Sequence, residues 1–249
     1  MRNLVSIIIT NYNYGQYLGA AVASAHNQTY EPIEVVLIDD GSTDASHELI
    51  KDLQKHYPKM RVVLQANSGT VKAKRKGIEE SSGEYFLHLD ADDELQPNAV
   101  ERLFAELTKH PEAGYAYSQM EMFGAKTGIV PTNKFSATHL VVRGNYISGS
   151  SLIRREAYLA TPGYVLERGP EDWDLWLSFL EQGFRGAYVP LPLVRYRQHA
   201  VTSRNTMTEA DYVASERALR QRHPKLMRTY AVPLFCYRVM SRIRRIIGS

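Results

Sequence analysis

The first 110 residues alternate short apolar runs with amphipathic segments, and this alternation constrains the fold more than any other feature. Four runs have the length and the β-branched or aromatic content of buried strands, at residues 4–10, 34–38, 61–64 and 85–89. Helices are expected between them, for example over residues 17–25 and on the apolar face of Leu49, Ile50 and Leu53. Strands that alternate with helices predict an α/β fold in which a mostly parallel sheet carries helices on both faces.

The alternation loosens after Pro111. Residues 115–123 and 128–131 predict a hairpin, and residues 145–154 a loop followed by a strand. Apolar residues at helical spacing from Trp173 to Leu180 predict a helix that begins near Glu171. A late strand at residues 188–196 contains two prolines, so we expect it at a sheet edge.

Composition bounds the class of protein. The chain has 249 residues, of which 44% are hydrophobic and 23% charged, as in a globular protein with one large domain or two packed halves. The single cysteine, Cys236, excludes an internal disulfide and permits a reducing compartment. The apolar run at residues 4–9 is too short for a signal peptide, and no run has the length of a bilayer span, so we expect a cytoplasmic protein.

Charge is distributed unevenly. Residues 217–249 contain nine of the 30 basic residues and none of the 27 acidic ones, so the rest of the chain has a net charge of −6. An acidic body is not expected to bind nucleic acid. Residues 235–247 are amphipathic and basic if helical, and such a segment docks on the body or a partner, lies on an anionic membrane surface, or stays disordered.

The strand at residues 85–89 ends in three carboxylates within four positions, Asp90, Asp92 and Asp93. Such crowded carboxylates tend to hold protons unless a cation lies among them. Mg²⁺ or Mn²⁺ is the expected cation, since these ions bind through carboxylates and substrate phosphates. The alternative is a turn and helix cap, which needs only one aspartate, and the pattern of an EF-hand loop is absent.

Other polar groups follow the remaining strands. Asp39 and Asp40 offer only acceptors, which suits a nucleobase or ribose, although an Asx turn explains them equally. Arg75 could pair with a diphosphate bidentately, whereas a solvated basic helix face is the more frequent reason for such a run. His199, just past the late strand, is a candidate metal or phosphate ligand or else a structural histidine.

A third acidic cluster comprises Glu171, Asp172 and Asp174, beside Trp173 and Trp176. Acidic side chains in a first helical turn are stabilised by the helix dipole without any further role. The neighbouring tryptophans indicate in addition a stiff, aromatic-walled setting for a sugar ring and a general base. Because the chain contains no glycine-rich dinucleotide loop, Walker A loop or zinc-type spacing, dehydrogenases and P-loop enzymes are disfavoured.

Taken in order, these fragments resemble the inverting family 2 glycosyltransferases of GT-A fold over about residues 4–200. The matching fragments are VSIIITNYN at 5–13, NQTY at 27–30, VLIDDGSTD at 36–44, GEY at 83–85, DADD at 90–93 and EDWDLW at 171–176. One departure is KRKG at residues 74–77, where the family often has Ala-Arg-Asn-Gly.

The resemblance implies one glycosyltransferase domain over residues 1–215, with a nucleotide-sugar half at 1–95 and a mixed acceptor-side half at 96–215. A basic helical extension would follow at 216–249. It implies a Rossmann-like central sheet and a divalent metal, Mn²⁺ or Mg²⁺. The donor would be a nucleotide-diphosphate sugar, with a UDP-sugar expected, and the acceptor a saccharide or lipid-linked hydroxyl of surface polysaccharide synthesis, which permits peripheral contact with the inner membrane face.

The resemblance also assigns roles to residues. Asp172 is implied as the catalytic base, with Glu171 and Trp173 on the acceptor side. Metal ligands are implied at Asp92, Asp93 and His199. The implied donor-binding residues are Thr10, Tyr12, Asp39, Asp40, Arg75, Asp90 and Asp92.

Three other classes remain open. A sugar nucleotidyltransferase has a related sheet, but it requires a glycine-rich, basic segment after its first strand. This chain has Asn11 and Tyr12 there. A phosphorylation receiver has its acidic pair after the first strand, and here the pair follows the second. A catalytically inactive sugar-binding relative is the third.

Overall fold

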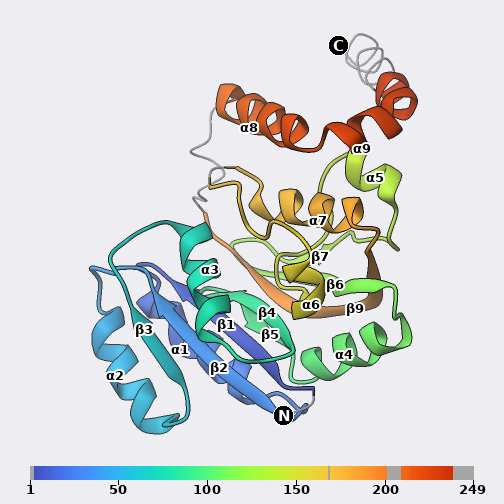
Figure 1. Ribbon diagram of the computed structural model, residues 1–249. Helices are drawn as coiled ribbons and strands as arrows, with labels where there is room; N and C mark the ends of the chain where they lie inside the picture. Colours follow the sequence, from blue (N-terminus) through green and yellow to red (C-terminus); the bar gives the residue numbers. More distant parts are fainter. Residues whose placement is uncertain (1–2, 168, 201–208, 238–249) are drawn as a thin grey trace.

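A computed structural model describes residues 3–167, 169–200 and 209–237 (Figure 1). Its first half is a parallel sheet in the order β3-β2-β1-β4, built from β1 (Val5–Asn11), β2 (Ile33–Asp39), β3 (Arg61–Leu64) and β4 (Tyr85–Asp90). The crossover helices are α1 (Gly15–His26), α2 (Ser46–His56) and α3 (Thr70–Glu80). The predicted alternation is therefore confirmed here, and β1 lies between β2, which pairs with its whole length, and β4, which pairs with residues 5–10.

The second half continues the same sheet with mixed directions, in the order β4-β8-β6-β9-β5. Its strands are β5 (Glu94–Leu95), β6 (Ala113–Gly124), β7 (Gly128–Val130), β8 (Leu152–Arg154) and β9 (Arg185–Gln198). Its helices are α4 (Ala99–Lys109), α5 (Ala137–Val142), α6 (Arg155–Leu159) and α7 (Glu171–Glu181). The predicted hairpin is β6 with β7, which pair antiparallel, and the helix expected near Glu171 is α7.

The late strand differs in part from its prediction. The short strand β5 pairs with Val194 and Arg195, so β9 is not the outermost strand and the expected edge position is wrong for these residues. The prolines lie where β9 has only β6 as a strand neighbour within the described chain, and the pairing skips Pro190 and Leu191 between Val189 and Pro192. A proline has no N–H to donate, so it is accommodated at such a bulge.

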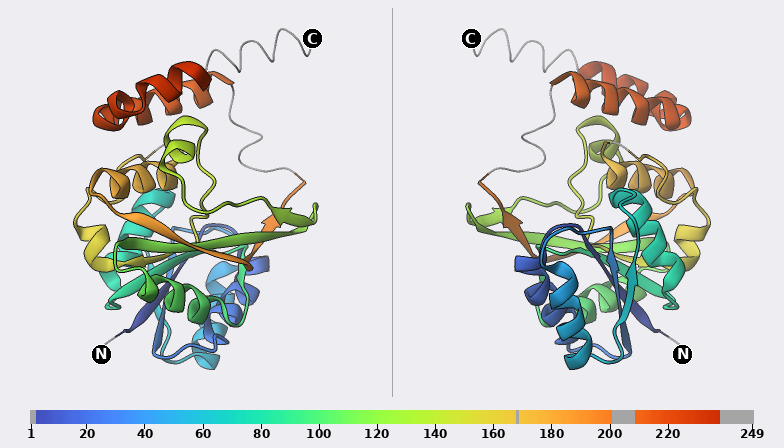
Figure 2. Two further views of the ribbon diagram at one scale, coloured as in Figure 1. Left: turned by 90° about the vertical axis from the view of Figure 1, so that its right-hand side faces the viewer. Right: turned by 90° about the vertical axis from the view of Figure 1, so that its left-hand side faces the viewer.

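The two faces of the sheet have separate cores, because successive strand residues point to opposite sides. Ile7 and Ile9 of β1 pack with α1, α2 and α4, whereas Ile8 packs on the side of α3 and α7. Figure 2 shows the sheet between these two helical layers. The layers are an ordinary consequence of covering both apolar faces of a central sheet.

Two further helices, α8 (Glu209–Arg222) and α9 (Pro224–Thr229), lie over α7 (Figure 2). Asp174 of α7 is fully buried and accepts a 2.7 Å hydrogen bond from Arg222 Nε, with His223 Nε2 at 2.9 Å. The boundary expected after residue 215 falls inside α8. Most of the amphipathic segment expected at 235–247 lies outside the described residues, and no described helix is long and apolar enough to cross a bilayer.

Candidate active site

The carboxyl ends of β1, β2 and β4 meet at one edge of the sheet, since these strands are parallel and in register. Thr10 of β1 stands beside Asp90 of β4 and Ile38 of β2, and Asn11 beside Asp39. Tyr12, directly after β1, is exposed at this edge. Open α/β sheets bind their ligands outside the carboxyl ends of the strands, so this edge is where the predicted site should lie.

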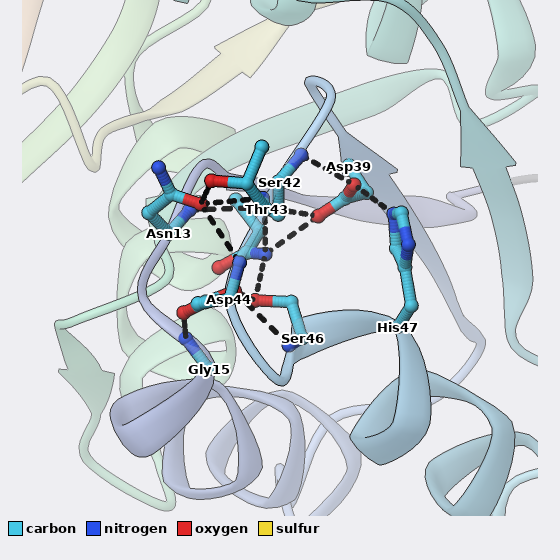
Figure 3. Close-up of polar contacts among 9 residues, drawn as sticks. Asn13, Gly15, Asp39, Ser42, Thr43, Asp44, Ser46 and His47 are labelled. Atoms are coloured by element: carbon cyan, nitrogen blue, oxygen red, sulfur yellow. Dashed lines mark hydrogen bonds and ion pairs between the residues drawn. The ribbon is translucent and has the colours of Figure 1, made fainter.

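Asp39 is the centre of a buried hydrogen-bond network at this edge (Figure 3). Its Oδ1 accepts from Asn11 Nδ2 at 2.7 Å and from Ser42 Oγ at 2.6 Å. Its Oδ2 accepts from the Ser42 backbone N–H at 3.1 Å and lies 2.9 Å from His47 Nε2. All of these contacts are within the chain, so Asp39 holds the loop after β2 against β1 in this structure.

Asp40 is held in the same way. Its Oδ1 accepts from Gln65 Nε2 at 2.7 Å and from the Ser68 backbone at 2.9 Å, and its Oδ2 accepts from the Gly69 backbone at 2.8 Å. Burial raises the pKa of Asp40, but these hydrogen bonds outweigh it and the net pKa is lowered. The adjacent Gly41 has φ +74, and a Cβ there would lie 2.6 Å from the backbone N of Asn67. The turn chemistry considered from sequence is therefore present.

The three carboxylates at the end of β4 and in the loop after it have different surroundings. Asp90 is exposed, Asp92 lies with Oδ2 at 2.7 Å from His199 Nε2, and Asp93 is buried, accepting from the Arg197 backbone N–H at 2.8 Å. Surrounding protein raises the pKa of Asp90 to about 6, with Lys74 opposing and Asp92, Asp172 and Glu171 adding to the rise. Burial is the largest cause of this rise, and the charges of Lys74, Asp92, Asp172 and Glu171 lie near enough to Asp90 to modify it.

Arg197 holds this acidic loop and was not identified from sequence. Besides its backbone contact with Asp93, its Nε donates to the Asp92 carbonyl at 2.9 Å, and its guanidinium lies over the Tyr17 ring at 4.3 Å. Burial raises the pKa of Asp93 well above its ordinary value, with Asp90 and Asp92 adding and Arg197 opposing. Repulsion from Asp90 and Asp92 therefore adds to the effect of burial on Asp93, and Arg197 partly offsets it.

Of the three candidate metal ligands, only Asp92 and His199 lie side by side. Within the described ranges, no cluster of three or more His, Cys, Asp or Glu side chains is placed to hold an ion. Asp92 and His199 are adjacent, however, and Asp93 is turned toward β9. A carboxylate beside an imidazole fits a divalent ion that takes few protein ligands and completes its coordination with phosphate oxygens.

The N-terminus of α7 brings Glu171 and Asp172 to the same region. Lys74 of α3 is 3% exposed, and its Nζ lies 3.0 Å from Glu171 Oε1 and 3.1 Å from Asp172 Oδ1. The Tyr164 hydroxyl lies 3.4 Å from the same Asp172 oxygen. A carboxylate that is held in this way but still partly open to solvent suits a general base.

Gly149 makes room for the Asp172 carboxylate. A Cβ at residue 149 would lie 2.4 Å from Asp172 Oδ2, so only glycine leaves this oxygen in its place. This contact joins residues that are 23 positions apart, and no pattern in the sequence indicated it.

Side chains of α3 and α7 differ in burial: Lys74, Trp173 and Trp176 are buried. Arg75 is exposed on α3, whereas Lys74 is the cation buried against the acids. Lys74 follows Val71 by three positions and precedes Ile78 by four, a spacing that indicated the buried helix face. Trp173 donates from its indole nitrogen to the Leu140 carbonyl at 2.8 Å and is buried in the core. Trp176 is fully buried, so neither tryptophan forms an exposed aromatic wall and that expectation is wrong.

Comparison with known proteins identifies the family of this chain and proteins with a similar fold. The model of the family described as glycosyl transferase family 2 matches residues 6–166. The uncharacterized glycosyltransferase YibD of Escherichia coli K12 is 26% identical over 260 residues, covering 94% of this chain and 74% of YibD. An uncharacterized glycosyltransferase of Rickettsia felis is 33% identical over 71% of this chain, and the match spans 31% of that relative's length.

Two solved structures resemble this one closely in shape. Staphylococcus aureus TarS 1–349 in complex with UDP-GlcNAc has a TM-score of 0.70 at 16% identity, covering 88% of this chain and 66% of that chain. The mannosyltransferase PcManGT of Pyrobaculum calidifontis, in complex with GDP-Man and Mn²⁺, has a TM-score of 0.63 at 15% identity, covering 94% and 75%. At these identities the likeness concerns the fold alone.

Proposed function

Because the chain belongs to glycosyl transferase family 2 and has the GT-A fold, we propose that it transfers a sugar from a nucleotide-diphosphate donor to an acceptor hydroxyl with inversion at the anomeric carbon. The donor is a UDP-sugar and the acceptor is a saccharide or a lipid-linked saccharide of surface polysaccharide synthesis. Family membership sets aside the nucleotidyltransferase and receiver alternatives.

One observation carries this proposal: acidic groups at the end of β4 and at the start of α7 gather at the carboxyl edge of the sheet. Burial raises the pKa of Asp90, Lys74 opposes the rise, and Asp92 and Asp172 add to it, so these charged groups lie near one another. Such a site has room for one positive ion and for a substrate that brings its own phosphates. Asp90 and Asp92 would contact the donor, together with Thr10 and Tyr12 at the end of β1.

The nucleoside would lie over the loops that follow β1 and β2. Asp39 and Asp40 shape this part of the site, and the Asp40 backbone N–H donates at 2.8 Å to the carbonyl of Asn11, which precedes the exposed Tyr12. Arg75, exposed on α3, would approach the diphosphate. TarS was solved with UDP-GlcNAc and PcManGT with GDP-Man, which supports a nucleotide-sugar donor and leaves its base to experiment.

Asp92 and His199 would hold the divalent ion, and Asp93 would support the loop beside them. When bound, the ion supplies positive charge that stabilises the departing diphosphate. The 2.7 Å contact between Asp92 and His199 supports this pairing, since it brings the two side chains together. PcManGT and the transferase GalNAc-T7, whose structures contain Mn²⁺, support manganese as the ion.

Asp172 would act as the base. It would take the proton of the acceptor hydroxyl, which attacks the anomeric carbon on the face opposite the diphosphate, so a single displacement inverts that carbon. Glu171 and Trp173 would lie on the acceptor side, with Glu171 partly exposed and Trp173 supporting α7 from the core.

We propose further that the reaction takes place at the cytoplasmic face of a membrane. Supporting this, residues 217–249 are basic, and Val232 and Phe235 expose 73% and 69% of their surface after α9. Basic and apolar groups together favour anionic lipid surfaces. Sedimentation of the chain with vesicles that contain anionic lipid, against neutral vesicles as control, tests this placement.

The proposal as a whole is tested by incubating the chain with UDP-GlcNAc, UDP-glucose, UDP-galactose or GDP-mannose, with Mn²⁺ or with EDTA. Release of nucleoside diphosphate that requires Mn²⁺, with thermal stabilisation by UDP only when Mn²⁺ is present, is the expected result. The anomeric configuration of the product, read by NMR, then tests inversion. Failure of every donor to bind or react would overturn the proposal.

A further inference from the structure

Lys74 is a buried cation whose charge the proposed reaction has not used. Its Nζ lies 3.0 Å from Glu171 Oε1, 3.1 Å from Asp172 Oδ1 and 5.3 Å from the centroid of the Tyr164 ring. An ammonium has three N–H donors, so these contacts engage two donors fully and direct the third toward the ring. Burial lowers the pKa of Lys74, but the charges of Asp172 and Glu171 have the larger effect. The net pKa is therefore well above its ordinary value. Lys74 is therefore charged at neutral pH.

The two oxygens of the Asp172 carboxylate have different surroundings. Oδ1 lies 3.1 Å from Lys74 Nζ and 3.4 Å from the Tyr164 hydroxyl. Oδ2 receives no hydrogen bond from the residues that the structure describes, and it lies in the space left by the missing Cβ of Gly149. One oxygen is thus tied to the protein, and the other keeps its lone pairs for a ligand.

We propose that Lys74 is a positioning residue for the transfer reaction, which ties Oδ1 of Asp172 and so presents Oδ2 to the acceptor hydroxyl. This inference rests on the proposed function, in which Asp172 is the base. In that step the acceptor oxygen forms a bond to the anomeric carbon and its proton moves to Oδ2. The bond between the anomeric carbon and the diphosphate oxygen breaks, and its electron pair leaves with the diphosphate.

The physical reason is orientation. A carboxylate free to rotate presents either oxygen over a range of directions, whereas one fixed by a charged donor keeps the second oxygen in place. Lys74 cannot move away at low cost, because a buried ammonium without partners would lose its hydration and gain nothing. Its two partners lie on the first turn of α7, so the ion pair also fixes α7 relative to α3.

The test compares Lys74→Met, Lys74→Arg and, as matched control, Lys76→Met. Lys76 lies on the same helix and pairs with Glu80 at 2.7 Å, away from Asp172. The assay is hydrolysis of whichever of the four nucleotide sugars named above the native chain turns over fastest, with water in place of the acceptor. We expect Lys74→Met to lower kcat about 30- to 100-fold with KM changed less than about 3-fold, since a misaligned base slows chemistry without weakening donor binding.

Lys74→Arg should retain kcat within about 5-fold, and Lys76→Met should match the native chain, because each keeps a cation on Asp172. Lys74→Gln, which donates a hydrogen bond without charge, takes the place of Lys74→Met if circular dichroism shows that the methionine variant does not fold. Native kcat in the uncharged variant, or an equal loss in Lys76→Met, would overturn the inference.

A double-mutant cycle separates positioning from general support of the fold. If Lys74 acts through Asp172, the Lys74→Met change should cost less than about 3-fold in a chain that already carries Asp172→Asn, because the residue it positions is gone. Multiplicative losses would show a separate role for Lys74 and refute the inference. Native activity in Asp172→Asn alone would instead refute the proposed function, so the two failures are distinguishable.

Discussion

Replacing Gly149 with alanine tests the placement of the candidate base in the sharpest way. The Cβ of alanine would lie 2.4 Å from Asp172 Oδ2, and ordinary contact begins at 3.4 Å, so this oxygen must retreat by about 1 Å. The carboxylate will move rather than the backbone, because it is the end of a side chain. Gly149 does not have a left-handed φ, so alanine adds no backbone strain.

A displacement of about 1 Å at a catalytic group costs roughly 100-fold in rate. We therefore expect Gly149→Ala to lower kcat for nucleotide-sugar hydrolysis about 100-fold, with the melting temperature and the UDP–Mn²⁺ dissociation constant nearly unchanged. Gly19→Ala on α1, where a Cβ would meet nothing within 4 Å, is the matched control and should retain full activity.

The assay measures release of UDP by steady-state kinetics and UDP binding by calorimetry. Native kcat in Gly149→Ala would show that Asp172 Oδ2 is not needed in this position, and would refute the reasoning. Loss of UDP binding in the same variant would show that the substitution disturbs the donor site as well, which the contact distances do not predict.

Three further predictions concern the metal, a turn and acid stability. His199→Ala should weaken the apparent affinity for Mn²⁺ in the presence of UDP by about 10-fold or more, measured by thermal-shift titration, with exposed His56→Ala as control. Gly41→Ala should lower the free energy of unfolding by about 1–3 kcal/mol in a denaturant titration, because its φ of +74 and the 2.6 Å approach to the Asn67 backbone exclude a Cβ; an unchanged midpoint would contradict the turn geometry. Burial raises the pKa of Asp174, but hydrogen bonds from His223 and Arg222 lower it on balance, so its contribution to stability is present above the ordinary aspartate pKa and is lost as pH falls through the lowered value. The melting temperature of the native chain should therefore fall more steeply below about pH 4 than that of Asp174→Asn.

Local sequence patterns were sufficient for the layout of the fold. The short length and β-branched content of β1 indicated a buried strand, and the helical spacing of apolar residues in α2 indicated a helix. Parallel strands then place their carboxyl ends together, so Asp39 and Asp90 could be assigned to one edge before any coordinate was known. The same patterns did not distinguish a buried tryptophan from one that lines a site, because Trp173 and Trp176 satisfy helical spacing in both cases.

By itself the sequence determined the alternating strands and helices of the first half, and which acidic groups stand at the ends of those strands. Only the tertiary structure decided which partner each acidic group contacts. The contacts join residues far apart in the chain: Lys74 and Asp172 are separated by 98 positions, Arg197 and Asp93 by 104, and His199 and Asp92 by 107. Periodicity reports the environment of a side chain along its own helix or strand, and it contains no information about the side chain that arrives from another element. The partner is chosen when the whole sheet and its helices pack, because only then do burial and charge select one arrangement.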